Sequence, residues 1–333
     1  MDKRWGESMS ELIQAITGAS TIAIGGHIRP DGDCVGSCMG LYGYIRDNFP
    51  EKKVTVYLEN FPEAFQYLET EEAFAEVCHV EKGENYDLFI ALDCGDVDRL
   101  GAVEPIMKGA KDTFCVDHHV TNTKFARQNL VVPEASSTSQ ILYTQMEKEK
   151  ISYEVACALY TGIIHDTGVF KHSNTSPETM TIAGELMGKG IPFGKIIDGS
   201  FYMKSYKQLQ IMGRCLMESV RIMDGRCIFS IVRKNIMDLY EAKPSDLDGI
   251  IDELRTTEGL EVAILLDERE PGEYKVSMRS NDFVDVSKIC TYFGGGGHVK
   301  AAGCTIKGAA FDVINNLTLH IEKQFEAAEE GQL

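Results

Sequence analysis

Acidic and imidazole side chains follow several apolar runs of this chain, at the points where those runs end. The run 20–25 (STIAIG) leads into a loop that places His27, Asp31 and Asp33 within seven residues. The run 87–92 (DLFIAL) is followed directly by Asp93. Carboxylate oxygens and imidazole nitrogens are common ligands of divalent metal ions. The pattern therefore points to metal-assisted hydrolysis.

Two further segments extend the pattern. The run 113–116 (TFCV) ends in Asp117, His118 and His119, and a long apolar helical stretch ends in Asp166. Each segment alone also has a structural interpretation, because an aspartate after a strand often caps the next helix and a D-x-D pair can form turns. Four chain segments that end in such groups favour one shared site over four separate caps.

Asp96 and His165 are expected to have structural roles beside that site. Asp96 follows Asp93 by three residues and is expected to cap the next helix. His165 precedes Asp166 and is expected to be a hydrogen-bonded structural residue.

The ligand types indicate the class of metal. Carboxylates and imidazoles without thiolates suit Mn²⁺ or a similar divalent ion better than a structural zinc ion. One aspartate shared by two ions is the arrangement of two-metal phosphatases and nucleases, in which the ions activate a water and hold the phosphate oxygens. We expect two Mn²⁺ ions per site, with Mg²⁺ or Co²⁺ as alternatives.

The apolar runs alternate with helical patterns through the first half of the chain. Strands are predicted at 20–25, 54–58, 87–92 and 113–116. Helices are predicted at 35–46, 138–149, 153–165, 177–188 and 204–217. Such alternation is typical of a parallel sheet covered by helices on both faces, and ligands of these sheets bind beyond the carboxyl ends of the strands.

The pattern changes after residue 217. Strands at 226–232, 261–266 and 274–279, with helices between and after them, predict a second, smaller α/β domain of mixed topology. The expected fold class is therefore α/β with two domains. We place a catalytic domain at 1–190, a helical linker at 191–217 and a substrate-binding domain at 218–333. The glycines and proline of 189–201 indicate a hinge.

Composition limits the ligands and the compartment. The net charge of −18 argues against long duplex nucleic acid, because neutralising many phosphates requires a basic surface. A short oligonucleotide that binds in one local pocket remains compatible with this negative charge. No apolar run approaches the ~20 residues that span a bilayer, and the first ten residues contain no signal-peptide core. Ten scattered cysteines indicate buried, reduced thiols, so we expect a cytoplasmic protein without a membrane partner. The oligomeric state is open, a homodimer included.

Four strings, in this order, resemble the motifs of the DHH phosphoesterase family: HIRPDGDCVGS, ALDCGD, VDHHVTN and HDTG. The resemblance implies a first metal ion held by His27, Asp31 and Asp93. It implies a second ion held by Asp33, Asp93, His118 and Asp166, with Asp93 as the bridging and catalytic carboxylate.

The same resemblance implies roles for three neighbouring residues. His119 would contact the reacting phosphate or the attacking water. Asp117 would orient a histidine rather than bind metal. Asn122, in the same string, would contact the substrate.

Two strings in the second half, SMRS at 277–280 and GGGGHVKAAGC at 294–304, resemble the DHH-associated domain. The glycines are expected to form a loop whose free backbone N–H groups bind a phosphate beside His298 and Lys300. Arg279 would add a bidentate phosphate contact. The resemblance thus implies these substrate-binding residues: Arg279, Ser280, Gly294, Gly295, Gly296, Gly297 and His298.

The second domain distinguishes between branches of the family. Its glycine-rich string differs from the pyrophosphatase branch, and the chain is too short for the extra modules of RecJ-like enzymes. The resemblance implies a nano-RNase that cleaves short oligoribonucleotides and converts pAp to AMP. The alternatives are a cyclic di-AMP phosphodiesterase and an inactive nucleotide-binding regulator, the latter disfavoured because every expected metal ligand is present. Lys171 stands where many relatives have arginine, which weakens the expected grip on a second phosphate such as that of pAp.

Overall fold

The computed structural model describes residues 9–59, 61–69, 74–76 and 85–331 of the chain. The chain forms two compact units, Met1–Met203 and Lys204–Leu333, each with its own sheet and core. The segment 191–217, expected to be a linker, is divided between the two units. Its last helix belongs to the second unit, because Ile211, Met212 and Cys215 are buried in a core of that unit.

A six-stranded parallel sheet forms the centre of the first unit, with the order β3-β2-β1-β4-β5-β6. Its strands are β1 Thr21–Gly25, β2 Lys53–Leu58, β3 Phe74–Glu76, β4 Leu88–Leu92, β5 Asp112–Asp117 and β6 Gln128–Val131. The four predicted strands are confirmed. The short β3 and the half-buried edge strand β6 were not predicted, because neither contains an apolar run long enough to mark it.

Helices cover both faces of this sheet. One face packs against α1 Glu11–Gly18, α2 Gly32–Asn48, α4 Thr138–Gln145, α5 Tyr153–Asp166 and α6 Pro177–Met187. The other face packs against η3 Val97–Val103 and α3 Glu104–Gly109. The strand order reverses between β1 and β4, and in such sheets a crevice for ligands opens at the carboxyl ends of those two strands.

The expected hinge at 189–201 is largely helical. It contains α7 Phe193–Ile197 and continues into η5 Asp198–Tyr202, a single π-helical turn. Ile191 and Ile196 are buried in the first unit's core, and this packing orders the segment despite its glycines. The short turns η1 Glu63–Leu68 and η4 Lys148–Lys150 complete the unit.

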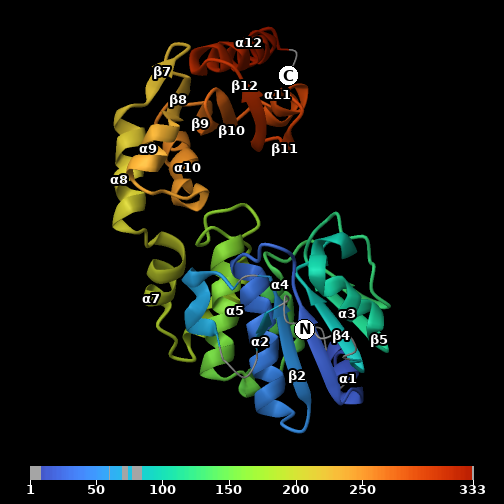
Figure 1. Cartoon of the computed structure of the whole chain (residues 1–333). Coiled ribbons are helices and arrows are strands. Elements are labelled where there is room, and N and C mark those ends of the chain that lie inside the picture. Colours follow the sequence, from blue (N-terminus) through green and yellow to red (C-terminus); the bar gives the residue numbers. More distant parts are fainter. Residues whose placement is uncertain (1–8, 60, 70–73, 77–84, 332–333) are drawn as a thin grey trace. The chain divides into compact units, whose positions relative to one another are not determined.

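Helices α2 and α5 lie side by side (Figure 1), with their backbones in unusually close approach. A Cβ atom on Gly36 of α2 would lie 2.5 Å from the Ala158 carbonyl oxygen and 2.7 Å from the Gly162 nitrogen of α5. Only glycine fits at this crossing. The contact brings the first turn of α2 and the last turn of α5 to the carboxyl end of the sheet.

The second unit contains a mixed six-stranded sheet with the order β11-β12-β10-β9-β8-β7, in which only β8 and β9 pair in parallel. Its strands are β7 Val220–Ile222, β8 Cys227–Val232, β9 Val262–Glu270, β10 Glu273–Ser280, β11 Gly296–His298 and β12 Ala301–Lys307. The three predicted strands are confirmed as β8, β9 and β10. The glycine-rich string, expected to be a loop, instead forms the β11–β12 hairpin.

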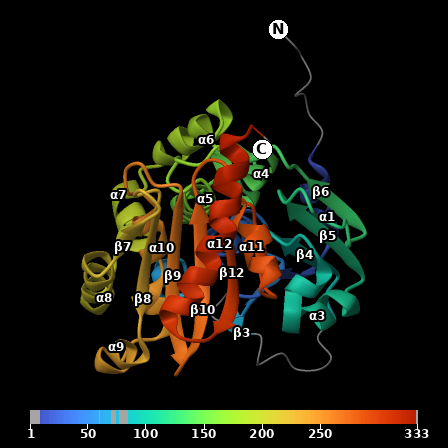
Figure 2. The ribbon, with the colours of Figure 1, turned by 90° about the horizontal axis from the view of Figure 1, so that it is seen from above.

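Helices also cover both faces of this second sheet. Its helical elements are α8 Tyr206–Met217, α9 Lys234–Leu239, η6 Pro244–Leu247, α10 Ile250–Arg255, α11 Val286–Tyr292 and α12 Ala310–Glu329. Helices α11 and α12 pack on one face, where α12 lies over the sheet and runs roughly along the strands (Figure 2). Helices α8 and α10 pack against β8 and β9 on the other face.

Two global features follow from the described residues. No helix among them is both long and apolar enough to cross a bilayer. Their nine cysteines are all free and buried, as the apolar surroundings of the cysteines in the sequence predict.

The α2–α5 crossing yields a stability prediction. Gly36→Ala should lower the free energy of unfolding of the first unit by about 1–3 kcal/mol, because the added methyl group overlaps backbone atoms of α5. The matched change Gly184→Ala, on an exposed position of α6 with no atom near the new methyl group, should raise it by about 0.5–1 kcal/mol. Urea unfolding followed by circular dichroism measures both. Equal stabilities for the two variants would contradict the close crossing.

Candidate active site

The loop after β1 and the start of α2 position the first group of side chains. Asp31 caps α2, and its Oδ1 accepts hydrogen bonds from the backbone nitrogens of Asp33 and Cys34, both at 3.1 Å. Its Oδ2 lies 3.7 Å from Nε2 of His27. Nδ1 of His27 contacts the Ile28 carbonyl oxygen at 2.8 Å, so Nε2 is directed toward the carboxylates.

Asp93, directly after β4, lies between imidazoles on two sides. Its Oδ2 is 3.5 Å from Nε2 of His27, and its Oδ1 is 3.5 Å from Nε2 of His118. The carboxylate is buried, and the backbone has a left-handed φ of 55°, a conformation that aspartate adopts more readily than most residues. Oδ2 of Asp166 approaches the same Nε2 atom of His118 to 2.9 Å.

Asp33 is fully buried and is held by the first turn of α4. Its Oδ2 accepts the backbone N–H of Thr138 at 2.6 Å, and its Oδ1 accepts that of Ser139 at 3.0 Å. Helix α5 leaves room for it, since a Cβ on Gly162 would lie 2.4 Å from Oδ1 of Asp33.

Thr138 was missed in the sequence. Its hydroxyl donates to Oδ1 of Asp93 at 3.2 Å. The available signal was the run SSTS before an apolar helix, which is typical of a helix start.

His119, Asp117 and Asn122 form a chain of hydrogen bonds, in which Asp117 contacts both other side chains. Oδ1 of Asp117 lies 2.7 Å from Nδ1 of His119, and the buried Oδ2 accepts from Nδ2 of Asn122 at 2.6 Å. The same amide group donates to the Cys94 carbonyl oxygen at 3.1 Å. The Asn122 amide, expected to contact the substrate, is therefore engaged in orienting Asp117. The imidazole of His119 remains partly exposed, with Nε2 free to meet a ligand.

The two residues with expected structural roles lie outside the cluster, and those roles are confirmed. Asp96 caps η3 by accepting from the Asp98 nitrogen. His165 packs edge-on against Phe65 and Phe201, and Nε2 lies 3.1 Å from the Ser200 hydroxyl. Burial lowers the pKa of His165 to about 4, so this imidazole is neutral. Lys171, the other residue singled out beside this motif, is exposed.

The electrostatics of the cluster favour a cation. Burial lowers the pKa of His27, but hydrogen bonds with Asp31 and Asp93 outweigh it and raise the value to about 11. Burial also lowers the pKa of His118, but hydrogen bonds with Asp166 and Asp93 outweigh this effect and raise the value to about 11. Burial raises the pKa of Asp33, and the charge of Asp93 raises it further. The carboxylates thus attract positive charge strongly.

The donor set fits divalent metal ions. Among the residues that the structure describes, there are three groups in which the potential ligand atoms lie within 4.8 Å of one another. These groups are His27 with Cys34 and Asp93, Asp93 with His118 and His119, and Asp33 with His118 and Asp166. The expected ligands therefore lie in one cluster, in which Asp93 lies between His27 and His118. Cys34, which was not expected there, is buried, and burial together with Cys38 raises the pKa of its thiol.

In the second unit, Arg279 and His298 share one face of the sheet. In the antiparallel register Ala301 pairs with Arg279 on one side and with His298 on the other, so only a small side chain separates them. Nε of Arg279 lies 3.2 Å from Oδ1 of Asp252 on α10. Ser280 points to the other face, where its buried hydroxyl donates to the Val284 carbonyl oxygen at 2.6 Å.

The glycines do not present a row of free N–H groups, which corrects the expectation from the sequence. Gly294, with a φ of 77°, donates to the Thr291 carbonyl oxygen, and Gly295 donates to that of Cys290, so the pair ends α11. Gly296 and Gly297 belong to β11, opposite Gly303 and Ala302. The Lys300 ammonium, also expected near a phosphate, donates to the Asp282 carbonyl oxygen.

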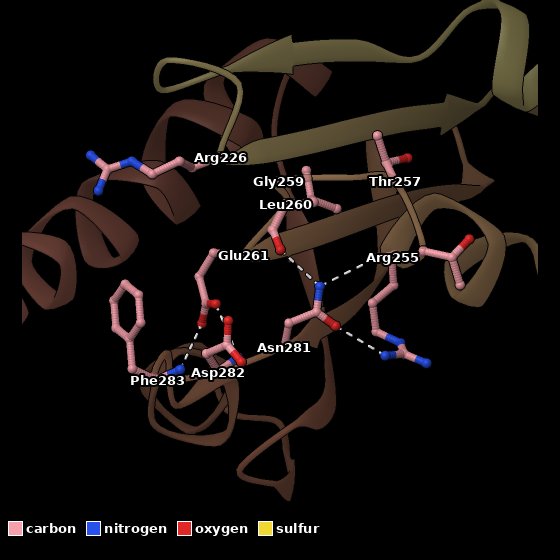
Figure 3. Close-up of a pocket in the computed structure, with 10 residues that line it drawn as sticks. Arg226, Arg255, Thr257, Gly259, Leu260, Glu261, Asn281, Asp282 and Phe283 are labelled. Carbon is pink, nitrogen blue, oxygen red and sulfur yellow. Dashed lines mark hydrogen bonds between the residues drawn. The ribbon is translucent and has the colours of Figure 1, made fainter. Parts of the chain in front are cut away.

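A pocket of about 620 Å³ opens in the second unit (Figure 3), but it lacks convergent chemistry. Arg226 and Arg255 point away from each other in this view. The Glu261 carboxylate accepts the backbone N–H groups of Asp282, Phe283 and Val284. The polar groups are thus satisfied within the protein, and the pocket is a separate feature from the carboxylate–imidazole cluster.

Comparisons with known proteins match this architecture. The chain matches the DHH family, N-terminal domain, over residues 21–163 and the DHHA1 domain over residues 230–326. It is 31% identical to the bifunctional oligoribonuclease and PAP phosphatase NrnA of Thermus thermophilus, over 93% of this chain and 92% of the relative. The Bacillus subtilis protein of the same name is 27% identical over 89% and 93%.

A solved structure shows the same fold. It is an exopolyphosphatase-related protein from Bacteroides fragilis, 24% identical, with a TM-score of 0.84 over 94% of both chains. The four motifs, the strand order that brings them together and the extent of these matches agree: the chain belongs to the DHH family of phosphoesterases, with an N-terminal DHH domain and a C-terminal DHHA1 domain.

Proposed function

We propose that this protein is a cytoplasmic, manganese-dependent enzyme that hydrolyses short oligoribonucleotides and also removes a phosphate from pAp. The names of relatives that match nearly the whole chain support this substrate class. The single observation that carries the proposal is the position of Asp93, whose two oxygens face His27 on one side and His118 on the other.

That geometry supports the two ligand sets that the family resemblance implies. His27, Asp31 and Asp93 would hold one ion, and Asp33, Asp93, His118 and Asp166 would hold the other. When bound, two such ions supply a nucleophile at neutral pH and neutralise charge on the phosphate oxygens. Oxygen and imidazole ligands favour Mn²⁺ over softer metals.

His119 would act on the substrate directly. Asp117 accepts the Nδ1 proton and thereby leaves Nε2 directed outward. The hydrogen bond to Asp117 raises the pKa of His119, which favours the doubly protonated ring. Nε2–H would then donate to an oxygen of the reacting phosphate, and Asn122 keeps Asp117 in position for this role.

Arg279 and His298 would hold a phosphate of the substrate, because they lie on the same face of the second sheet, where His298 is exposed and Arg279 is partly exposed. Ser280 and the residues Gly294–Gly297 would shape that face rather than bind the ligand. The net charge of −18 suits substrates that need a few local contacts instead of a long basic surface.

A substrate panel tests the function. Given equal amounts of 5′-phosphorylated diadenylate, pAp and cyclic di-AMP with Mn²⁺, the protein should consume the linear dinucleotide fastest and pAp next, as chromatography would show. Asp93→Ala should consume none of the three. Preferential opening of cyclic di-AMP would make the protein a cyclic dinucleotide phosphodiesterase, and inactivity toward all three would favour a nucleotide-binding regulator.

The contribution of Arg279 can be measured separately. Arg279→Lys should raise KM for the dinucleotide about tenfold, equal to about 1.4 kcal/mol, because lysine cannot make the two parallel hydrogen bonds of a guanidinium. Arg214→Lys, on an exposed ion pair of α8, is the control and should leave KM unchanged. If both variants keep the wild-type KM, Arg279 does not bind the substrate.

Metal binding should release protons. Because the pKa values of His27 and His118 are both raised to about 11, both imidazoles carry protons at pH 7 without metal, and an ion that binds Nε2 must displace them. Calorimetry in buffers of different ionisation enthalpy should detect the release of about two protons from these rings.

The sign of the pH dependence follows from the same values. The competing protons become scarcer as the pH rises toward 11, so the apparent Mn²⁺ affinity should increase between pH 6 and 9. His118→Gln should release about one proton fewer, whereas His320→Gln, in the second unit, should match the wild type. Heats that do not depend on the buffer would argue against imidazole ligation.

A further inference from the structure

The first turn of α4 contacts buried carboxylates that come from two different parts of the fold. Asp33 belongs to the first turn of α2, and Asp93 follows β4. We propose that Thr138 is a positioning residue that fixes both carboxylates, and that its hydroxyl holds the Asp93 side chain in the rotation in which one oxygen faces His27 and the other faces His118. This inference rests on the proposed two-metal function.

Thr138 makes one contact to each carboxylate with a different group. Its backbone N–H donates to Oδ2 of Asp33 at 2.6 Å, and its hydroxyl donates to Oδ1 of Asp93 at 3.2 Å. Thr138 and Asp33 are fully buried, and Asp93 is 2% exposed. One residue therefore links the two carboxylates where water does not compete for the hydrogen bonds.

The rotation of the Asp93 side chain decides whether its two oxygens face His27 and His118 separately. In the structure Oδ2 faces His27, and Oδ1 faces His118. The Thr138 hydroxyl donates to Oδ1 alone, so it favours this rotation over one in which a single oxygen serves both imidazoles. Since the backbone of Asp93 is left-handed, strand pairing alone does not determine the side-chain direction.

The turn that carries Thr138 is itself held in place by neutral groups. Ser137 caps α4, and Oε1 of Gln140 accepts from the Ser136 hydroxyl at 2.7 Å and from the Thr179 hydroxyl at 2.8 Å. Nδ2 of Asn174 donates to the carbonyl oxygens of Ser136 at 3.0 Å and of Asp166 at 3.2 Å. The turn is thereby tied to the segment of the third aspartate as well.

The absence of charge in this turn matters chemically. A lysine or arginine beside Asp33 and Asp93 would occupy the lone pairs that a metal ion needs and would repel the ion. Hydroxyl and backbone N–H donors leave further lone pairs on each oxygen for a cation. Such supporting contacts typically change metal affinity by about 10–100-fold when they are removed.

The variant Thr138→Val separates the two contacts. It keeps the backbone N–H to Asp33 and nearly the same volume, and it removes only the hydroxyl that donates to Asp93. Thr138→Ser restores the hydroxyl without the methyl group. Thr144→Val makes the same substitution in the last turn of the same helix, where the threonine is exposed and its hydroxyl donates to the Ile141 carbonyl oxygen and accepts from Nε2 of Gln145.

The test is a Mn²⁺ titration of the full chain without substrate, with free Mn²⁺ followed by electron paramagnetic resonance. Thr138→Val should bind Mn²⁺ about 10–100-fold more weakly, whereas Thr138→Ser and Thr144→Val should stay within about threefold of the wild type. Wild-type affinity in Thr138→Val, or equal losses in Thr138→Val and Thr138→Ser, would overturn the role of the hydroxyl. If the valine variant does not fold by circular dichroism, Thr138→Ala replaces it with the same criteria.

Kinetics then distinguish positioning from substrate contact. At saturating Mn²⁺, Thr138→Val should lower kcat for the dinucleotide with KM unchanged, and a raised KM with unchanged kcat would contradict the assignment. A wild-type protein that binds Mn²⁺ but cleaves none of the substrates would refute the proposed function alone. A wild-type protein that binds no Mn²⁺ would refute the proposed function and this inference together.

Discussion

Three aspartates that repel one another have to lie together at the carboxyl end of the first sheet. Burial raises the pKa of Asp33 and of Asp166, and the negative charge of Asp93 raises both pKa values further. A fold keeps such a cluster only if its backbone is held rigidly from several directions. The surrounding structure provides this: two strand ends at the reversal of strand order, the α2–α5 crossing, and the first turn of α4.

The close crossing of α2 and α5 connects packing to chemistry. Gly36 lets the two helix backbones touch, and Gly162 leaves the space that the Asp33 carboxylate and the Ser139 side chain occupy. The same pair of glycines therefore sets the distance between the helices that carry the Asp33 and Asp166 carboxylates.

Much of the first unit could be predicted from the sequence, because its signals are local. Apolar runs marked β1, β2, β4 and β5, and the acidic and imidazole residues of the site stood at the ends of β1, β4 and β5. Thr138 could not be recognised as part of the site, because a serine-rich helix start has the same sequence whether or not a buried aspartate lies above it. The hydrogen bonds of Asn122 could not be predicted for a similar reason, since its motif does not show that its amide donates to Asp117 and to the Cys94 carbonyl oxygen.

The second unit was harder to predict, because its glycine-rich string at 294–304 is compatible with two local structures. Four glycines suit a phosphate loop, but they also suit a helix end followed by a tight hairpin, and the structure has the latter. The strand register nevertheless places Arg279 and His298 on one face of the sheet.

The candidate metal ligands and the Arg279–His298 strip lie in different units. All three groups of potential metal ligands come from the first unit, among the residues that the structure describes. Cations that bind there stabilise the folded first unit by mass action, so its stability is linked to the metal supply. The strip around Arg279 carries no such link, because its contacts are made within the second sheet and with Asp252. Under the proposed function, changes at Arg279 and His298 would therefore alter substrate choice without disturbing the ligand cluster, whereas changes within that cluster would affect stability and catalysis together.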